Sequence, residues 1–212
     1  MLITRRHLIS TGTAATLATI AGIGHAQVPT SAQELGPFYP VHHLADTDAD
    51  LTHLRGRPGV AKGTPVNIVG RVLDTQGNPV RGARLELWQA NAAGRYRHPG
   101  DSANSAPIDP NFQGFALLKS DRDGHFRFRT IKPGAYPIGG GKWRTPHIHV
   151  DVSGREERLT TQMYFPGEPL NASDVVFAYA DPKDSVVARA VERLSGDPNA
   201  AAFAWDIVLA VG

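Results

Sequence analysis

Val66-Asn-Ile-Val-Gly-Arg-Val-Leu-Asp74 is the segment that most directly indicates the architecture of the chain. It is rich in β-branched residues, which predicts a strand, and Gly77-Asn78-Pro79 just after it predicts a turn. Arg84-Leu-Glu-Leu-Trp88 then alternates polar and apolar residues, as a strand with one buried face does. Short strands separated by turns in this way indicate an all-β chain with two packed sheets.

Two later segments continue this pattern. Asp121-Arg-Asp-Gly124 lacks the spacing and the distal glutamate of an EF-hand loop, so it is interpreted as a plain turn. The next residues, His125 to Arg129, form a strand in which Phe126 and Phe128 face the core. Residues 203–209 alternate apolar and other residues as a closing strand. We therefore predict an antiparallel β-sandwich of transthyretin-like or immunoglobulin-like type.

The chain divides into three predicted parts: residues 1–26, 27–63 and 64–212. The first holds Thr4-Arg-Arg-His-Leu-Ile-Ser10, a weakly apolar stretch and a small residue before a cleavage point. These features predict a twin-arginine signal peptide and export to the periplasm or the medium. The second part is an irregular N-terminal arm. The third is the sandwich itself, with a short helix over Asp184–Leu194, where apolar residues recur at helical spacing.

Composition excludes several classes of protein. The chain has 22 Lys and Arg against 20 Asp and Glu, and removal of the signal peptide with Arg5 and Arg6 leaves 20 against 20. This balance and the lack of a basic stripe argue against a nucleic-acid partner. The absence of cysteine excludes disulfides, thiolate metal sites and cysteine nucleophiles. No later stretch has the roughly 20 apolar residues of a membrane-spanning helix, so the mature form should have none.

Tyrosines and histidines mark the candidate site. Tyr96 follows Gly-Arg, Tyr136 lies in Pro-Gly-Ala-Tyr-Pro, and His147 and His149 form a His-x-His pair. Residues two apart on a strand share a face, so both imidazoles point one way while Ile148 packs on the other. Imidazole binds many metals, whereas phenolate is a hard anionic oxygen donor. Two phenolates with two imidazoles suit a hard trivalent ion such as Fe(III), whose charge would displace the phenol protons.

These segments resemble the intradiol ring-cleavage dioxygenases, the family of protocatechuate 3,4-dioxygenase and catechol 1,2-dioxygenase. The resemblance runs from about Gly36 to about Gly167 and includes Gly36-Pro-Phe-Tyr-Pro40. It implies Fe(III) as cofactor, and a catechol of the protocatechuate or catechol type that is cleaved with O2 to a cis,cis-muconate-type diacid. The four implied iron ligands are Tyr96, Tyr136, His147 and His149. A catechol dianion that replaces one tyrosinate and a hydroxide would leave the ferric centre neutral, which suits a buried site.

The resemblance also implies a role for each side chain. Tyr136 matches the tyrosinate that leaves when substrate chelates and that takes a substrate proton, and Tyr96 matches the one that stays. Arg144 matches an arginine that stabilises the electron-rich bound substrate. Gln162 matches a polar residue near the side of the ring that reacts with oxygen. The implied substrate-binding residues are Tyr164, Trp88 and Phe38; for Trp88, plain core packing is an equal alternative.

One segment departs from the family pattern. The loop Pro137-Ile-Gly-Gly-Gly-Lys-Trp143 is glycine-rich and carries Ile138 where protocatechuate dioxygenase β chains carry a tryptophan. It lies near the implied substrate, so the choice of catechol stays open. Protocatechuate dioxygenases also build their pocket from two related chains. The missing wall would then be Gly36–Tyr39, either of the same chain or of a neighbour in a homo-oligomer.

Two other classes of function stay open at this point. His147, His149 and Asp151 on one strand face could bind copper, zinc or ferrous iron, which leaves Tyr96 and Tyr136 without a role. Alternatively, the chain is a metal-free periplasmic binding module, which leaves the His-x-His pair without a role. The colour of the purified protein separates the three interpretations, because ferric tyrosinate absorbs strongly in the visible range.

Overall fold

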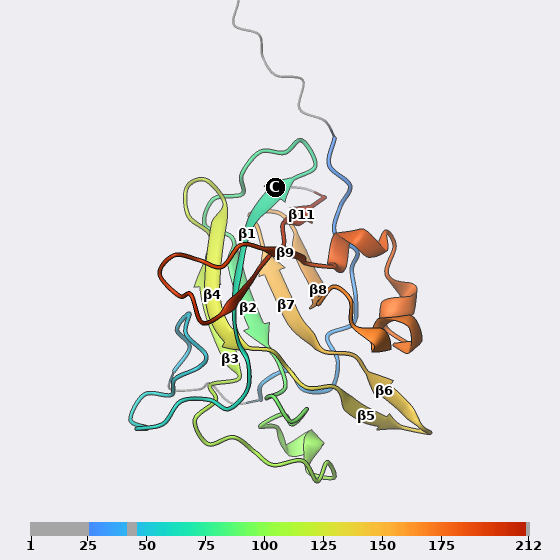
Figure 1. Ribbon diagram of the computed structural model, residues 1–212. Helices are drawn as coiled ribbons and strands as arrows, with labels where there is room; N and C mark the ends of the chain where they lie inside the picture. Colours follow the sequence, from blue (N-terminus) through green and yellow to red (C-terminus); the bar gives the residue numbers. More distant parts are fainter. Residues whose placement is uncertain (1–25, 42–45, 211–212) are drawn as a thin grey trace, which may run out of the picture.

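The computed structural model describes residues 26–41 and 46–210, so the predicted signal peptide lies, except for Ala26, outside the described residues. Two sheets pack face to face (Figure 1). The first sheet carries the candidate site and is antiparallel throughout, in the order β3-β2-β7-β8. Its strands are β2 (Arg84–Trp88), β3 (Phe115–Lys119), β7 (His147–Ser153) and β8 (Arg158–Tyr164).

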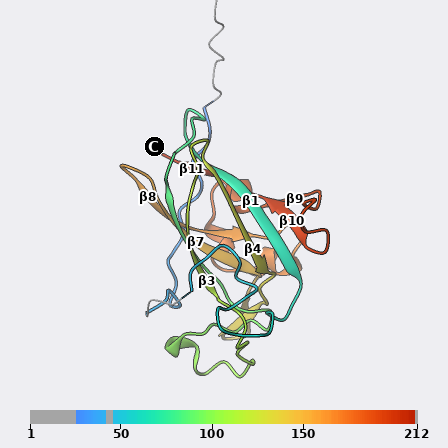
Figure 2. The ribbon, with the colours of Figure 1, turned by 90° about the vertical axis from the view of Figure 1, so that its left-hand side faces the viewer.

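The second sheet is built around one long strand, which can be followed along its length in Figure 2. β1 pairs antiparallel with β4 on one side and parallel with β10 and β11 on the other, while β9 pairs antiparallel with β10. These strands are β1 (Pro65–Asp74), β4 (His125–Ile131), β9 (Arg189–Val191), β10 (Ala201–Ala204) and β11 (Ile207–Leu209). The all-β sandwich is confirmed, but the closing segment runs parallel to its neighbour.

The predicted closing strand over residues 203–209 is split in two. At the break, the amide of Trp205 donates to the carbonyl of Val69 at 2.9 Å. A Cβ on Gly70 would lie 1.8 Å from the carbonyl oxygen of Trp205, so only glycine permits this approach. The close crossing interrupts the ladder and separates β10 from β11.

The predicted helix over Asp184–Leu194 is wrong. The segment begins with a single 3-10 turn, η4 (Lys183–Val186), and continues as strand β9. Val186 and Ala188 are both buried, which is the two-residue period of extended chain. The amide of Ala188 donates to the carbonyl of Tyr164 at 2.9 Å. Pairing with β8 and β10 thus outweighs the helical spacing of the apolar residues.

The core lies between the two sheets. Ile148, Val150 and Val152 of β7 point into it, as predicted, and so do Phe126 and Phe128 of β4. Burial of each such side chain contributes roughly 1.5–3 kcal/mol. β7 therefore has one face in the core, and its other face is free to carry polar groups.

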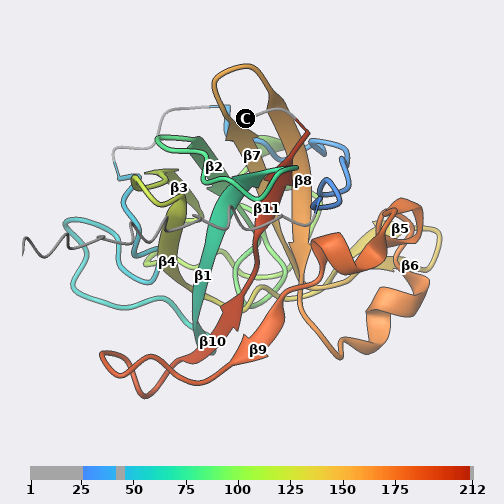
Figure 3. The same ribbon diagram turned by 90° about the horizontal axis from the view of Figure 1, so that it is seen from above.

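Short elements surround the site-bearing end of the first sheet (Figure 3). The β5–β6 hairpin projects from the body of the protein, and 3-10 turns lie beside it. These elements are β5 (Tyr136–Gly139), β6 (Lys142–Arg144), η1 (Pro99–Asp101), η2 (Pro169–Ser173) and η3 (Phe177–Tyr179). The N-terminal segment, residues 26–41, runs along β8, where the amide of Gln33 donates to the carbonyl of Thr160 at 2.8 Å. Within residues 26–41 and 46–210, no helix has the length and apolar character to cross a membrane.

Candidate metal centre

The His-x-His pair lies at the N-terminal end of β7. His147 and His149 are both buried, and their Nε2 atoms face one another at 3.1 Å. On the opposite face of the strand, Ile148 is fully buried in the core. The predicted division of β7 into an apolar face and an imidazole face is what the structure shows.

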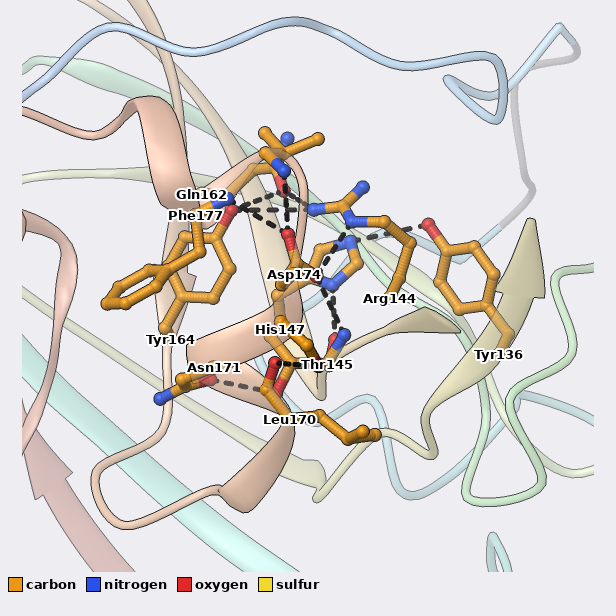
Figure 4. Close-up of polar contacts among 12 residues, drawn as sticks. Tyr136, Arg144, Thr145, His147, Gln162, Tyr164, Leu170, Asn171, Asp174 and Phe177 are labelled. Carbon is orange, nitrogen blue, oxygen red and sulfur yellow. Dashed lines mark hydrogen bonds and ion pairs between the residues drawn. The ribbon is translucent and has the colours of Figure 1, made fainter. Parts of the chain in front are cut away.

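The tautomer of His147 follows from its neighbours (Figure 4). Its Nδ1 lies 2.6 Å from the carbonyl oxygen of Thr145, which only accepts, so Nδ1 carries the proton and donates. Nε2 then carries a lone pair that points into the site. Metal-binding histidines commonly have this arrangement, in which a hydrogen bond from one ring nitrogen leaves the other free to bind the metal. Burial, with the charge of Arg144 as a lesser cause, holds the pKa of His147 well below its usual range. Burial and then His147 do the same for the pKa of His149. Both imidazoles are neutral, the form that binds metals.

The two tyrosines complete the cluster. Tyr136 Oη lies 3.4 Å from His147 Nε2, and the Tyr96 ring stands edge-on to the Tyr136 ring at 5.4 Å. Their loops meet because Gly94, at φ +74°, packs its backbone on the carbonyl of Ala135. A Cβ on Gly94 would lie 2.2 Å from that oxygen, which explains the glycine before Arg-Tyr.

The donor set fits a bound cation. Burial first, and then Tyr136, raises the pKa of Tyr96 well above its usual range. Burial likewise raises the pKa of Tyr136 against the opposing charge of Arg144. Tyr96 Oη is buried and has no hydrogen-bond partner among the described residues, and a buried orphan of this kind calls for a ligand. Two neutral imidazoles and two phenols that a cation would deprotonate are a donor set for a hard metal ion.

Arg144 anchors a second buried network beside these donors (Figure 4). Its Nε donates to Asp174 Oδ2 at 2.9 Å, and its Nη2 donates to Gln162 Oε1. Tyr164 Oη donates to Gln162 Oε1 at 3.0 Å and lies 3.4 Å from Arg144 Nη2. Burial favours the neutral form of Arg144, but Tyr136 and Asp174 reverse this and raise its pKa, so the guanidinium stays charged. The structure thus brings Arg144, Gln162 and Tyr164 together next to Tyr136.

Sequence reasoning missed Asp174. This carboxylate is buried and also accepts the amide of Thr145 at 2.8 Å. Its other oxygen accepts the amides of Val176 and Phe177, which is the pattern of a helix N-cap. The sequence signal was an aspartate just before Val-Val-Phe, but nothing in the sequence pairs it with Arg144.

Phe38 and Trp88 lie against the tyrosine and histidine rings. Phe38 stacks on Tyr96 at 4.6 Å, and Trp88 stacks on His149 at 4.8 Å with nearly parallel planes. Both line a cavity of about 180 Å³ that adjoins Tyr96 but does not extend to Tyr136 or the histidines. Tyr164 lines no part of it, because its hydroxyl is turned toward Arg144 and Gln162.

The alternative site built on Asp151 is not assembled. Asp151 Oδ1 accepts Arg158 Nε at 2.8 Å, and Oδ2 accepts Thr160 Oγ1 at 2.6 Å. In the described part of the chain, one group of three or more histidine and acidic side chains brings its ligand atoms within 4.8 Å, and it lies elsewhere. It is the exposed turn of Asp121, Asp123 and His125, where Asp121 Oδ1 caps backbone amides.

Known proteins share this arrangement of sequence and fold. A family model described as "Dioxygenase" matches residues 35–211. The protocatechuate 3,4-dioxygenase β chain of Burkholderia cepacia is 42% identical, over 83% of this chain and 77% of that relative. A hydroxyquinol 1,2-dioxygenase from Rhizobium sp. (strain MTP-10005) is 32% identical over 80% of this chain, which spans only 58% of that relative.

Solved structures agree with the sequence relatives. The dioxygenase domain of a carbohydrate-binding fusion protein from Streptomyces sp. SirexAA-E superposes with a TM-score of 0.65 at 28% identity, and the match covers 87% of this chain and all of that domain. Catechol 1,2-dioxygenase from Pseudomonas arvilla C-1 gives 0.61 at 26% identity, over 89% of this chain and 63% of that one. On these grounds the chain belongs to the intradiol ring-cleavage dioxygenase family.

Proposed function

We propose that the chain is a non-haem Fe(III)-dependent intradiol dioxygenase that opens a catechol with O2 to a cis,cis-muconate-type diacid. The observation that carries this proposal is the convergence of Tyr96, Tyr136, His147 and His149 on one enclosed point. The two Nε2 atoms are 3.1 Å apart, and the hydroxyl of Tyr136 is 3.4 Å from one of them. Iron, the metal typical of this family, would supply the positive charge that binds both catechol oxygens and lowers the pKa of the phenols.

The side chains around this point divide the remaining work. Tyr136, as a tyrosinate, would accept a proton from a catechol hydroxyl, because burial raises its pKa and so favours the protonated phenol. Arg144 supplies a fixed positive charge in a site closed to water, where such a charge stabilises electron density on a bound ring. Gln162 and Tyr164 hold the guanidinium of Arg144 in place. The proposed role of Tyr164 is therefore to position Arg144 and not to contact substrate directly.

A catechol is the proposed substrate class. Phe38 and Trp88 provide flat apolar surface beside the proposed ligands Tyr96 and His149, as an aromatic substrate requires. The relatives named for protocatechuate and for hydroxyquinol make these two diols the first candidates, together with catechol itself. The family resemblance puts the β5–β6 hairpin near the substrate, so its exposed residues Ile138 and Trp143 are candidates for setting this choice.

Export by the twin-arginine route is proposed on the Arg5-Arg6 motif, the weakly apolar stretch after it and the small residue Ala26 before the cleavage point. That route carries folded proteins, so iron would enter the site before export. The same pathway would place the enzyme in the periplasm or outside the cell.

The experiment is iron analysis with oxygen uptake on the purified protein. We expect one ferric ion per chain, a visible tyrosinate absorption band, and oxygen consumption with a catechol. A protein that stays colourless and inactive after iron loading would remove the basis of the proposal.

A further inference from the structure

Residues 33–39 of the N-terminal arm cross the first sheet beside the candidate site. The amide of Gln33 donates to the carbonyl of Thr160 at 2.8 Å, and the carbonyl of Glu34 accepts Gln162 Nε2 at 3.1 Å. The arm is therefore tied to β8 before it reaches the tyrosine and histidine rings.

The next residues lie directly on those rings. Gly36, at φ +73°, approaches His149 so closely that a Cβ would lie 3.1 Å from its Cε1. Phe38 stacks on Tyr96 at 4.6 Å and stands edge-on to Tyr136 at 6.0 Å. Within four residues, the arm contacts three of the four proposed iron ligands.

Tyr39 joins this segment to strand β2. Its ring stands edge-on to Trp88 at 5.1 Å, and Trp88 in turn stacks on His149. Its hydroxyl donates to Glu86 Oε2, and this hydrogen bond is the first cause of the raised pKa of Tyr39. Glu86 is only 4% exposed and also pairs with Arg84, so its carboxylate is fixed on both sides.

The charges around Glu86 make this contact specific. Asp151 faces Glu86 across the β2–β7 pairing and is itself held by Arg158 and Thr160. Two buried carboxylates side by side are stable only when each has its own donors. Tyr39 provides Glu86 with a donor that no residue of the sheet replaces at that oxygen in the described structure.

We propose that Tyr39 and Glu86 form a latch that holds Gly36–Tyr39 over the metal site, so that one chain closes its own site. Both are positioning residues, because they act through Phe38 and Trp88 and do not touch the proposed ligands themselves. The latch is a contact between the arm and β2; its effect on iron and substrate rests on the proposed function.

The test is Tyr39→Phe, which removes the hydroxyl and keeps the ring against Trp88. Tyr179→Phe is the matched control, because Tyr179 is 87% exposed. Hydrogen exchange of the peptide covering residues 33–41, on the protein as purified, reports the latch directly. We expect exchange about tenfold faster in Tyr39→Phe, because a hydrogen bond to a charged group is lost, and no change in the control.

Two further measurements connect the latch to the site. In iron-containing protein, Tyr39→Phe should release iron to a chelator faster, and KM for a catechol should rise more than kcat falls. Adding Tyr39→Phe to Glu86→Gln should produce much less than the sum of the two single effects, as expected for direct partners.

The outcomes separate the two proposals. Arm exchange in Tyr39→Phe equal to that of the Tyr179→Phe control would overturn the latch. Faster exchange with unchanged iron release and KM would overturn its role in closing the site. If neither the unsubstituted protein nor any variant binds iron, but hydrogen exchange in the arm is still faster in Tyr39→Phe, the latch is supported and the proposed dioxygenase function is overturned.

Discussion

Arg144 and Asp174 form a buried ion pair, with Nε donating to Oδ2 at 2.9 Å and both side chains almost fully enclosed. The pair joins β6 to the turns that follow β8, two segments that are far apart in the sequence. Asp174 also accepts the backbone amide of Thr145, whose carbonyl fixes the tautomer of His147. One carboxylate therefore positions both the charged arginine and a proposed iron ligand.

Asp174→Asn should destabilise the protein by about 3–5 kcal/mol, because it leaves the Arg144 charge buried without its partner. Chemical denaturation measures this loss. Asp197→Asn is the control, since Asp197 pairs with Arg129 in a more exposed position and should cost much less. Equal losses of stability in the two variants would mean that the buried ion pair contributes no more than the more exposed one.

The two tyrosines should respond differently to loss of the hydroxyl. Tyr96→Phe should lose visible colour or iron, because the phenolate that stays bound is gone. Tyr136→Phe should retain some iron but turn over slowly, because the leaving ligand and proton acceptor is missing. Metal analysis and steady-state kinetics distinguish the variants, and normal turnover by Tyr136→Phe would show that its assigned role is incorrect.

Arg144→Ala should reduce turnover by roughly two orders of magnitude, since loss of one preorganised charge-stabilising contact typically costs about 3 kcal/mol. Substrate affinity should change less than turnover. Single-turnover kinetics separates binding from chemistry. An effect confined to affinity would assign Arg144 to substrate binding instead.

The ring-opened product should be a muconate-type diacid and nothing else. Mono-phenols should bind weakly and not react, because two oxygens must reach the metal. Product analysis with protocatechuate, catechol and hydroxyquinol tests both statements. Detection of a yellow hydroxymuconic semialdehyde would indicate extradiol cleavage and contradict the proposed site.

Replacement of Arg5 and Arg6 by lysine should leave the uncleaved precursor in the cytoplasm. Cell fractionation with an antibody measures it, and a periplasmic protein exported by another route serves as the control. Unchanged export of the double variant would remove the twin-arginine assignment.

Local patterns in the sequence predicted the features that depend on neighbouring residues, such as which face of a strand is buried. The two-residue period of β7 predicts that Ile148 faces away from His147 and His149, and Ile148 is buried in the core on the opposite face. The strands of the core follow in the same way, since alternation reports burial directly. The convergence of Tyr96 and Tyr136 with these histidines came from family resemblance, because no local pattern joins loops so far apart.

Contacts between distant segments could not be predicted. Nothing near Asp174 or Glu86 in the sequence names Arg144 or Tyr39 as a partner. The helix expected at Asp184–Leu194 failed for the same reason, because hydrogen bonds to β8 and β10 decide its conformation.

β7 belongs to the hydrophobic core through one face and to the candidate metal centre through the other. Any substitution that places a larger or smaller side chain at Ile148 or Val150 would move the backbone that carries both imidazoles. The strand therefore has little freedom to vary, and new substrate preferences would have to arise elsewhere. The hairpin around the exposed Ile138 and Trp143 can change without disturbing the core, so diversification of this enzyme should concentrate there.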